Sequence, residues 1–166
     1  MEIRALQQED IEPIAEAFAC LGWNKPASQY VKYLQEQERG ERQILVAFRE
    51  RTFLGYLTVV WESHYPPLRE AGIPEIVDFN VLPEFRKQGI GSRLMDQAEA
   101  LISERSAVAG IGVGMDPDYG AAQRLYIKRG YVPDGRGLSY EDRQVVYGQM
   151  VAVDDSLVLH FTKQLR

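Results

Sequence analysis

Residues 86–92, Arg-Lys-Gln-Gly-Ile-Gly-Ser, combine two glycines with positive charge just before a helix-like segment. The first backbone N–H groups of an α-helix have no partner within the helix and can bind an anion. Gly89 and Gly91 remove side chains where phosphate oxygens must approach the backbone, and Arg86 and Lys87 add positive charge. The pattern predicts a pyrophosphate-binding loop, although two glycines alone are equally typical of a plain strand-to-helix turn.

Two other nucleotide-binding motifs are excluded at this loop. It contains neither the G-x-x-x-x-G-K-[ST] pattern of a P-loop nor the G-x-G-x-x-G pattern of a dinucleotide-binding fold. A further glycine series, at positions 110, 112 and 114, lies inside an apolar run rather than before a helix. We interpret that series as a close-packed or splayed strand.

The remaining pattern is one of alternating strands and helices around this loop. Period-2 and buried apolar runs predict strands at residues 2–6, 43–48, 53–61, 75–81, 107–115, 144–153 and 157–165. Helical spacing predicts helices near residues 11–18, 28–39, 92–102 and 122–129. The proline- and glycine-rich segments 63–74 and 132–143 are expected to be loops. The order predicts an α/β or α+β domain around one mixed sheet.

Composition limits the class of protein. The 166 residues, 45% of them apolar, fit a single domain over residues 1–166. A net charge of -5 argues against general nucleic-acid binding. The single cysteine, Cys20, allows no intrachain disulfide, so the cytoplasm is the expected location. No signal peptide and no membrane-spanning run is expected, and the cysteine and two histidines form no metal-ligand pattern.

Two segments resemble one known family. VLPEFRKQGIGSRLM, residues 81–95, is similar to the signature of the GNAT superfamily of acyl-CoA-dependent N-acetyltransferases, in which V-x-P and [RQ]-x-x-G-x-[GA] precede a helix. AAQRLYIKRGYVP, residues 121–133, is similar to the later family helix A-x-x-L-Y-x-x-x-G-[FY]. The resemblance implies a mixed, mostly antiparallel sheet flanked by helices, with a splayed strand pair that holds acetyl-CoA, and it implies no metal.

The resemblance also implies how the cofactor is held. Backbone amides of the loop would bind the pyrophosphate, and main-chain groups near Phe79 and Val81 would pair with the pantetheine arm. Where family members often carry asparagine, this chain has Tyr119, so one polar contact to the cofactor is lost or replaced. The predicted cofactor-binding set is Phe79, Val81, Arg86, Lys87, Gln88, Gly89, Ile90, Gly91, Ser92 and Tyr119.

The implied reaction is attack of an amine on a thioester. A lysine-like amine with a pKa near 10.4 is neutral in only about one molecule in 2500 at pH 7, so a general base is expected. Glu75 is the first candidate, by its position in the family, and Asp78 is the second; alternation places them on opposite strand faces unless a bulge intervenes. Tyr126 would protonate the leaving thiolate or donate a hydrogen bond to it. Spacing alone favours a core position for Tyr126, and the resemblance reverses that preference.

The acceptor is expected to be a small-molecule or peptide amine. In this family it usually binds between the first two helices and the loop before the last two strands, which suggests Trp23, Tyr30 and Asp134 here. Nothing in these residues names the amine. The alternative function is a non-catalytic acyl-CoA-binding regulatory module on the same fold, and a homodimer is possible because dimers are common in the family.

Overall fold

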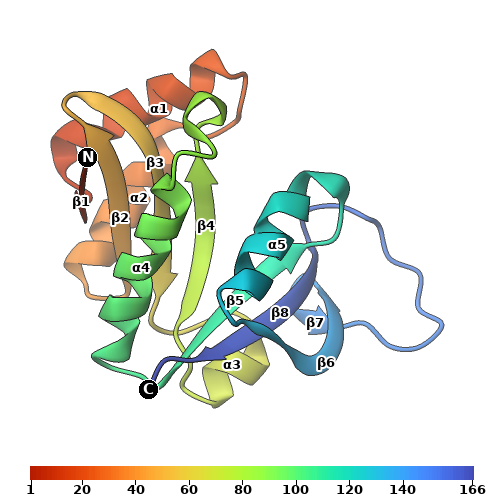
Figure 1. Ribbon diagram of the computed structural model, residues 1–166. Helices are drawn as coiled ribbons and strands as arrows, with labels where there is room; N and C mark the ends of the chain where they lie inside the picture. Colours follow the sequence, from red (N-terminus) through yellow and green to blue (C-terminus); the bar gives the residue numbers. More distant parts are fainter. The chain divides into compact units, whose positions relative to one another are not determined.

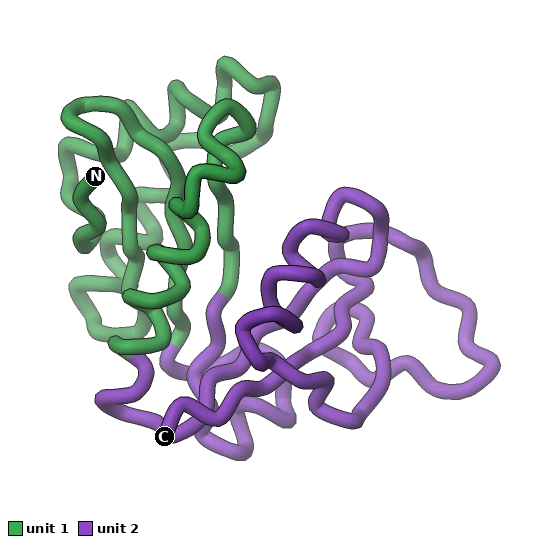
Figure 2. The backbone as a smooth tube through the Cα atoms, viewed as in Figure 1, with its two compact units in different colours: residues 1–60, 77–101 green, residues 61–76, 102–166 purple.

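A computed structural model describes residues 1–166 and divides the chain into two compact units (Figure 2). The first unit contains residues 1–60 and 77–101, and the second contains residues 61–76 and 102–166. The prediction of a single domain over the whole chain stays a prediction. None of the helices is long and apolar enough to cross a membrane.

The first unit is a sheet with helices on both faces (Figure 1). Its strands, in sheet order, are β1 (Glu2–Ala5), β2 (Arg42–Arg49), β3 (Thr52–Val60) and the part of β4 (Glu75–Val81) that follows Ile76. The helices α1 (Ile11–Cys20) and α2 (Ala27–Glu38) cover one face, and α4 (Ile90–Ser103), most of which belongs to this unit, covers the other. Almost every residue of β2 and β3 is therefore buried.

Aromatic side chains fill the core between α1, α2 and the sheet. Phe18 of α1 stacks on Trp23 at 5.6 Å between ring centroids and meets Tyr56 of β3 edge-on at 5.9 Å. Tyr30 of α2 also meets Tyr56 edge-on, at 5.6 Å. Such pairs contribute beyond the area that they bury. They place the hydroxyl of Tyr56 against Asp78 in β4 and the hydroxyl of Tyr30 next to that of Tyr56.

The second unit is a smaller sheet with two helices. It contains α3 (Pro66–Glu70), β5 (Val108–Gly114), α5 (Gly120–Lys128), β6 (Val132–Tyr140), β7 (Arg143–Gln144) and β8 (Leu157–Gln164). Its strand order runs from the start of β4 through β5, β8 and β6 to β7. β4 pairs with β5 in parallel at only two registered positions, whereas the pairs β5–β8, β6–β8 and β6–β7 are antiparallel, as are β1–β2 and β2–β3. The predicted fold class, a mixed and mostly antiparallel sheet with flanking helices, is confirmed.

The glycines of β5 make room for large neighbouring side chains. A Cβ added at Gly110 would lie 2.6 Å from a methyl carbon of Leu68 in α3, and one at Gly112 would lie 2.7 Å from Val158 in β8. A Cβ at Gly114 would lie 2.4 Å from the Tyr119 ring. These three glycines therefore allow neighbouring side chains to pack closely against β5, and they do not form a phosphate-binding loop.

Three sequence-based assignments were wrong. Residues 63–74 were expected to be a loop, but Pro66 and Pro67 occupy the first turn of α3, where proline needs no N–H partner. Residues 132–143 were also expected to be a loop, yet they form β6, which pairs with β8 on both sides of a register shift between Pro133 and Leu138. The strand expected at 144–153 is absent beyond Gln144, and these residues form an extended loop.

Gly55 of β3 permits close approach of β4. A Cβ at this position would lie 2.5 Å from the carbonyl oxygen of Asn80 and 2.9 Å from the Cα of Val81. We therefore expect Gly55→Ala to lower the free energy of unfolding by about 1–3 kcal/mol, as measured by urea denaturation. Gly120→Ala is the matched control, because nothing lies within 4 Å of its Cβ position. Equal stability of the two variants would contradict the packing argument.

Candidate functional site

The glycine-containing loop leads directly into α4. A short 3-10 turn, Pro83–Phe85, precedes it, and α4 begins at Ile90. Lys87 and Gly89 adopt positive φ values of 61° and 79°, which only glycine tolerates without strain. Turns of this kind, followed by the N-terminus of a helix, direct successive N–H groups toward one anion. The backbone of the loop is thus suited to a pyrophosphate.

Contacts to β4 brace this loop. A Cβ at Gly91 would lie 3.1 Å from the ring of Phe79, so the ring packs directly against the first turn of α4. The Nε of Arg86 donates a hydrogen bond to the carbonyl oxygen of Val81 at 3.1 Å. The side chain of Ile90 is buried and anchors the helix start. Phe79, Arg86 and Ile90 therefore support the loop, and Lys87 is an exposed cation within it.

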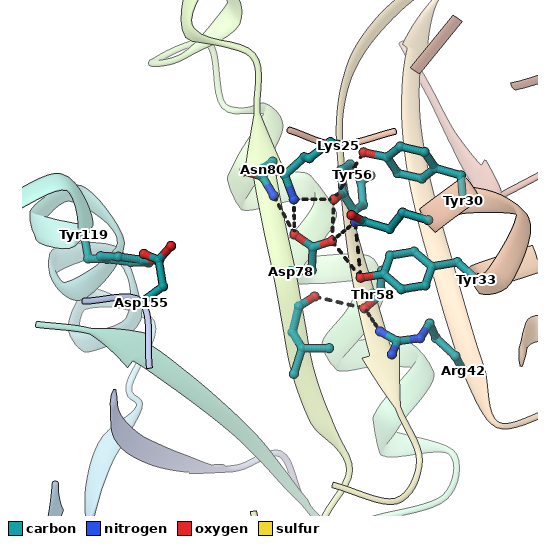
Figure 3. A network of polar contacts seen from close by, with 12 residues as sticks. Lys25, Tyr30, Tyr33, Arg42, Tyr56, Thr58, Asp78, Asn80, Tyr119 and Asp155 are labelled. Carbon is teal, nitrogen blue, oxygen red and sulfur yellow. Dashed lines mark hydrogen bonds and ion pairs between the residues drawn. The ribbon is translucent and has the colours of Figure 1, made fainter. Parts of the chain in front are cut away.

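Asp78 lies at the centre of a polar network in the middle of β4 (Figure 3). Its Oδ1 accepts hydrogen bonds from Lys25 Nζ at 2.7 Å and Asn80 Nδ2 at 2.9 Å. Its Oδ2 accepts from Tyr33 Oη at 2.9 Å and Gln29 Nε2 at 3.0 Å, and also from the Tyr56 hydroxyl. A carboxylate offers about four lone-pair sites. Five donors therefore leave it no acceptor capacity for a further group.

The backbone at Asp78 is also unusual. Its φ of 49° is left-handed, which costs a non-glycine residue about 1–2 kcal/mol and breaks the alternation of a strand. The preceding residue is held from β3, because Thr58 Oγ1 donates to the carbonyl oxygen of Val77 at 3.0 Å and in turn accepts from Arg42 at 2.7 Å. The network thus fixes a kink in β4 one residue before Phe79.

Burial keeps the tyrosines of this network in the donor form. It raises the pKa of Tyr56 far above the ordinary value, and the nearby Asp78 charge raises it further. Burial likewise raises the pKa of Tyr33, again with the help of Asp78. Both phenols therefore stay protonated at neutral pH and stabilise a negative charge on Asp78.

Glu75 lies in a separate, buried cluster in the second unit. The carboxylate, whose residue is 6% exposed, accepts a hydrogen bond from Ser63 Oγ at 2.5 Å. Its other oxygen lies 3.5 Å from Nε2 of His160, and Nδ1 of His160 lies 3.3 Å from the Ser139 hydroxyl. The Tyr65 ring stacks on the imidazole at 3.6 Å between centroids. Glu75 therefore retains acceptor capacity on one oxygen, beside an imidazole that can carry a proton.

Tyr126 and Tyr119 belong to α5 and the turn before it. Tyr126 is 5% exposed and packs near Tyr131, and burial is the main cause that raises its pKa. Tyr119 packs its ring on Gly114 and donates its hydroxyl to Asp155 at 2.8 Å. Its own pKa is raised by burial and by Asp155. The hydroxyl of Tyr119, which stands where the family often has asparagine, is thus engaged by a protein carboxylate.

The three residues proposed to contact the acceptor have different surroundings. Tyr30 is fully buried at 0% exposure, so its ring packs in the core, and its contact with the acceptor stays a prediction. Trp23 is half-buried in the loop between α1 and α2 and stacks on Phe18. Asp134 accepts a hydrogen bond from Tyr65 Oη at 3.0 Å and from the backbone N–H of Arg136. Trp23 and Asp134 remain candidates.

Sequence reasoning did not single out Lys25, Tyr56 or His160. The sequence does contain one general indication of such partners, because a carboxylate in a buried strand requires hydrogen-bond donors or a cation beside it. Lys25 lies 53 residues before Asp78, however, and no local pattern connects the two. Likewise, His160 reaches Glu75 only because β8 and β4 both flank β5.

A sequence model described as the acetyltransferase (GNAT) family matches residues 8–131, which include both the glycine loop and Tyr126. No curated protein sequence matches the chain significantly.

Solved structures share the fold over nearly the whole chain. An N-acetyltransferase from Staphylococcus aureus Mu50 is 17% identical with a TM-score of 0.71, covering 99% of this chain and 98% of that one. A ribosomal-protein-alanine N-acetyltransferase from Brucella melitensis is 19% identical with a TM-score of 0.70, covering 99% of both chains. The PaiA N-acetyltransferase from Thermoplasma acidophilum, solved with coenzyme A, is 15% identical with a TM-score of 0.66, covering 98% of both. At these identities the likeness concerns the fold alone.

Proposed function

Because this chain belongs to the acetyltransferase (GNAT) family, we propose that it transfers an acetyl group from acetyl-CoA to a primary amine. The observation that carries the proposal is the loop before α4, where positive φ at Gly89 and the close contact of Gly91 with Phe79 leave the backbone of both glycines without a covering side chain. Some of the similar proteins are N-acetyltransferases, and one of them is solved with coenzyme A.

The residues of the loop fit a pyrophosphate. We assign its binding to the backbone amides of Gln88, Gly89, Gly91 and Ser92, with the side chain of Lys87 adding positive charge. Main-chain groups of β4 near Phe79 and Val81 would pair with the pantetheine arm. When bound, acetyl-CoA supplies a thioester whose carbonyl carbon an amine attacks. The role of Tyr119 is indirect in this proposal, because its hydroxyl is engaged by Asp155.

Glu75 is the better supported of the two candidate bases. One of its oxygens has spare acceptor capacity and faces His160, whereas Asp78 already accepts five hydrogen bonds, one of them from an ammonium group. Glu75 would take the proton from the acceptor's amine, directly or through one water, as the C–N bond forms. Catalysis by Asp78 stays a prediction, and its hydrogen bonds favour a different role.

Tyr126 would donate a hydrogen bond to the sulfur as the C–S bond breaks. Proton transfer from an ordinary phenol, with a pKa near 10, to a thiolate whose thiol has a pKa near 8.5 is already unfavourable by about 2 kcal/mol. Burial raises the pKa of Tyr126 and increases that cost. Full proton transfer is therefore disfavoured, and stabilisation of the developing negative charge is the role that remains.

We expect Tyr126→Phe to lower kcat by roughly tenfold, the value of one hydrogen bond, while the Kd of acetyl-CoA stays unchanged. The ring is retained, so the core around Tyr131 should keep its packing. Steady-state thiol release gives kcat, and calorimetry gives the Kd. An unchanged kcat would remove Tyr126 from the mechanism.

The acceptor is proposed as a primary amine, small or peptidic. Trp23 and Asp134 are the residues we propose to contact it. The assay that tests the proposed function measures thiol release from acetyl-CoA with a panel of amino acids, peptide N-termini, polyamines and aminoglycosides, and identifies the acetylated product by mass spectrometry. Acceptor-dependent release supports the transferase. Binding without release for every amine would instead support a regulatory acyl-CoA-binding module.

A further inference from the structure

The cation that neutralises Asp78 comes from the chain itself. Lys25, in the loop between α1 and α2, has a side chain only 19% exposed, and its Nζ lies 2.7 Å from Oδ1 of Asp78. The same Nζ lies 5.7 Å from the ring centroid of Phe18 and 5.6 Å from that of Tyr56. A cation held between a carboxylate and aromatic faces is well stabilised. An acceptor ammonium has no place at Asp78 while Lys25 occupies it.

The hydrogen bonds to Asp78 hold one particular backbone conformation. One comes from Asn80 in β4 itself, and the other four come from the loop before α2 (Lys25), α2 (Gln29 and Tyr33) and β3 (Tyr56). Figure 3 shows Lys25, Tyr33 and Tyr56 pointing toward the carboxylate. Strained backbone persists where the surroundings over-determine it. The left-handed φ of Asp78 is such a case.

The kink at Asp78 continues into the loop that we assign to the cofactor. The next residue, Phe79, packs its ring against Gly91 in the first turn of α4. Two residues further on, the carbonyl oxygen of Val81 accepts the hydrogen bond of Arg86. A short series of direct contacts therefore runs from the Asp78 carboxylate through Phe79 and Val81 to both ends of the glycine loop.

We propose that Lys25 and Asp78 form an internal clamp that fixes the kink in β4 and thereby positions the glycine loop for the pyrophosphate. Both are positioning residues and neither reacts with substrate. The inference rests on the proposed function for the identity of the ligand. The effect of the clamp on the conformation of residues 79–92 does not depend on which ligand binds there.

The test is a double-mutant cycle with Asp78→Asn and Lys25→Met. Asparagine keeps the shape of the side chain and tolerates positive φ, so Asp78→Asn removes mainly the charge. Methionine keeps most of the length of lysine without its charge. Each single variant breaks the pair, and we expect the Kd of CoA to rise roughly tenfold in each. The double variant breaks the same single interaction, so its Kd should also lie roughly tenfold above the wild-type value and not roughly 100-fold above it.

A second readout follows the loop without any ligand. Hydrogen exchange of the amides of residues 79–92 should be faster than in the wild type in both single variants, and the double variant should exchange no faster than they do. Lys32→Met is the control, because Lys32 is exposed and its Nζ lies 3.7 Å from Glu36 on the same helix; both readouts should stay unchanged. If the wild-type protein fails to bind CoA, the proposed function is wrong. Hydrogen exchange of the wild type, the two single variants and the double variant still tests the clamp in that case.

Two results would overturn the clamp. The first is an Asp78→Asn variant with wild-type CoA affinity and wild-type exchange but a greatly reduced kcat, which would make Asp78 the base. The second is a double variant whose Kd rises by the product of the two single effects, roughly 100-fold, because the two side chains would then act independently.

Discussion

Replacing Gly89 with glutamate is expected to abolish CoA binding and leave the domain folded. The Cβ position of Gly89 faces open space, with nothing within 4 Å, so a side chain there meets no protein atom. A carboxylate at the start of α4 would instead occupy the place of the pyrophosphate and repel it. We expect the Kd of CoA to rise by at least about 1000-fold, as measured by calorimetry.

The Gly89→Glu experiment requires a control for backbone strain. Gly89 has a φ of 79°, and any residue with a side chain is strained at that φ. Gly89→Asn supplies a polar side chain that tolerates this conformation and carries no charge. We expect Gly89→Asn to weaken CoA binding far less than Gly89→Glu, with similar thermal stability for both. Unchanged CoA affinity in Gly89→Glu would remove the pyrophosphate from this loop.

Replacing Glu75 with glutamine is expected to lower kcat/KM by roughly 100-fold or more, the contribution of a general base. The neutral amide of glutamine cannot take the proton from the amine, so the C–N bond-forming step should slow. The measurement is thiol release at saturating acetyl-CoA over a range of amine concentrations, which gives kcat/KM for the amine.

Glutamine at position 75 can still accept the hydrogen bond of Ser63, so the buried cluster should remain intact. Glu62→Gln is the matched control, since Glu62 is exposed and close in sequence. If Glu75→Gln keeps the wild-type kcat/KM, this carboxylate takes no part, and the acceptor must reach the thioester already neutral.

The strands and helices with strong local patterns were predictable. β4 was assigned to its observed bounds, because a segment rich in apolar residues and interrupted only by Asp78 and Asn80 follows Glu75 and ends before Pro83. β6 was missed because its residues 133–137, Pro-Asp-Gly-Arg-Gly, resemble a loop. Its pairing with β8 comes from the tertiary structure, and positive φ at Gly135 and Gly137 accommodates the irregular register.

The candidate site was predictable only in part. The glycine loop is a continuous segment, so sequence alone could suggest its function. Asp78 was recognised as a buried carboxylate, but Lys25 and Tyr56 reach it from distant segments. The left-handed conformation of Asp78 also has no sequence signal comparable to glycine. Roles that depend on partners across the fold therefore required the structure.

The most direct test of the central claim is calorimetric titration of the purified protein with acetyl-CoA, with ATP and NAD as competing candidates. The account predicts that acetyl-CoA binds, that neither ATP nor NAD binds comparably, and that Gly89→Glu loses the acetyl-CoA signal. Absence of acetyl-CoA binding, or preferential binding of ATP or NAD, would contradict it.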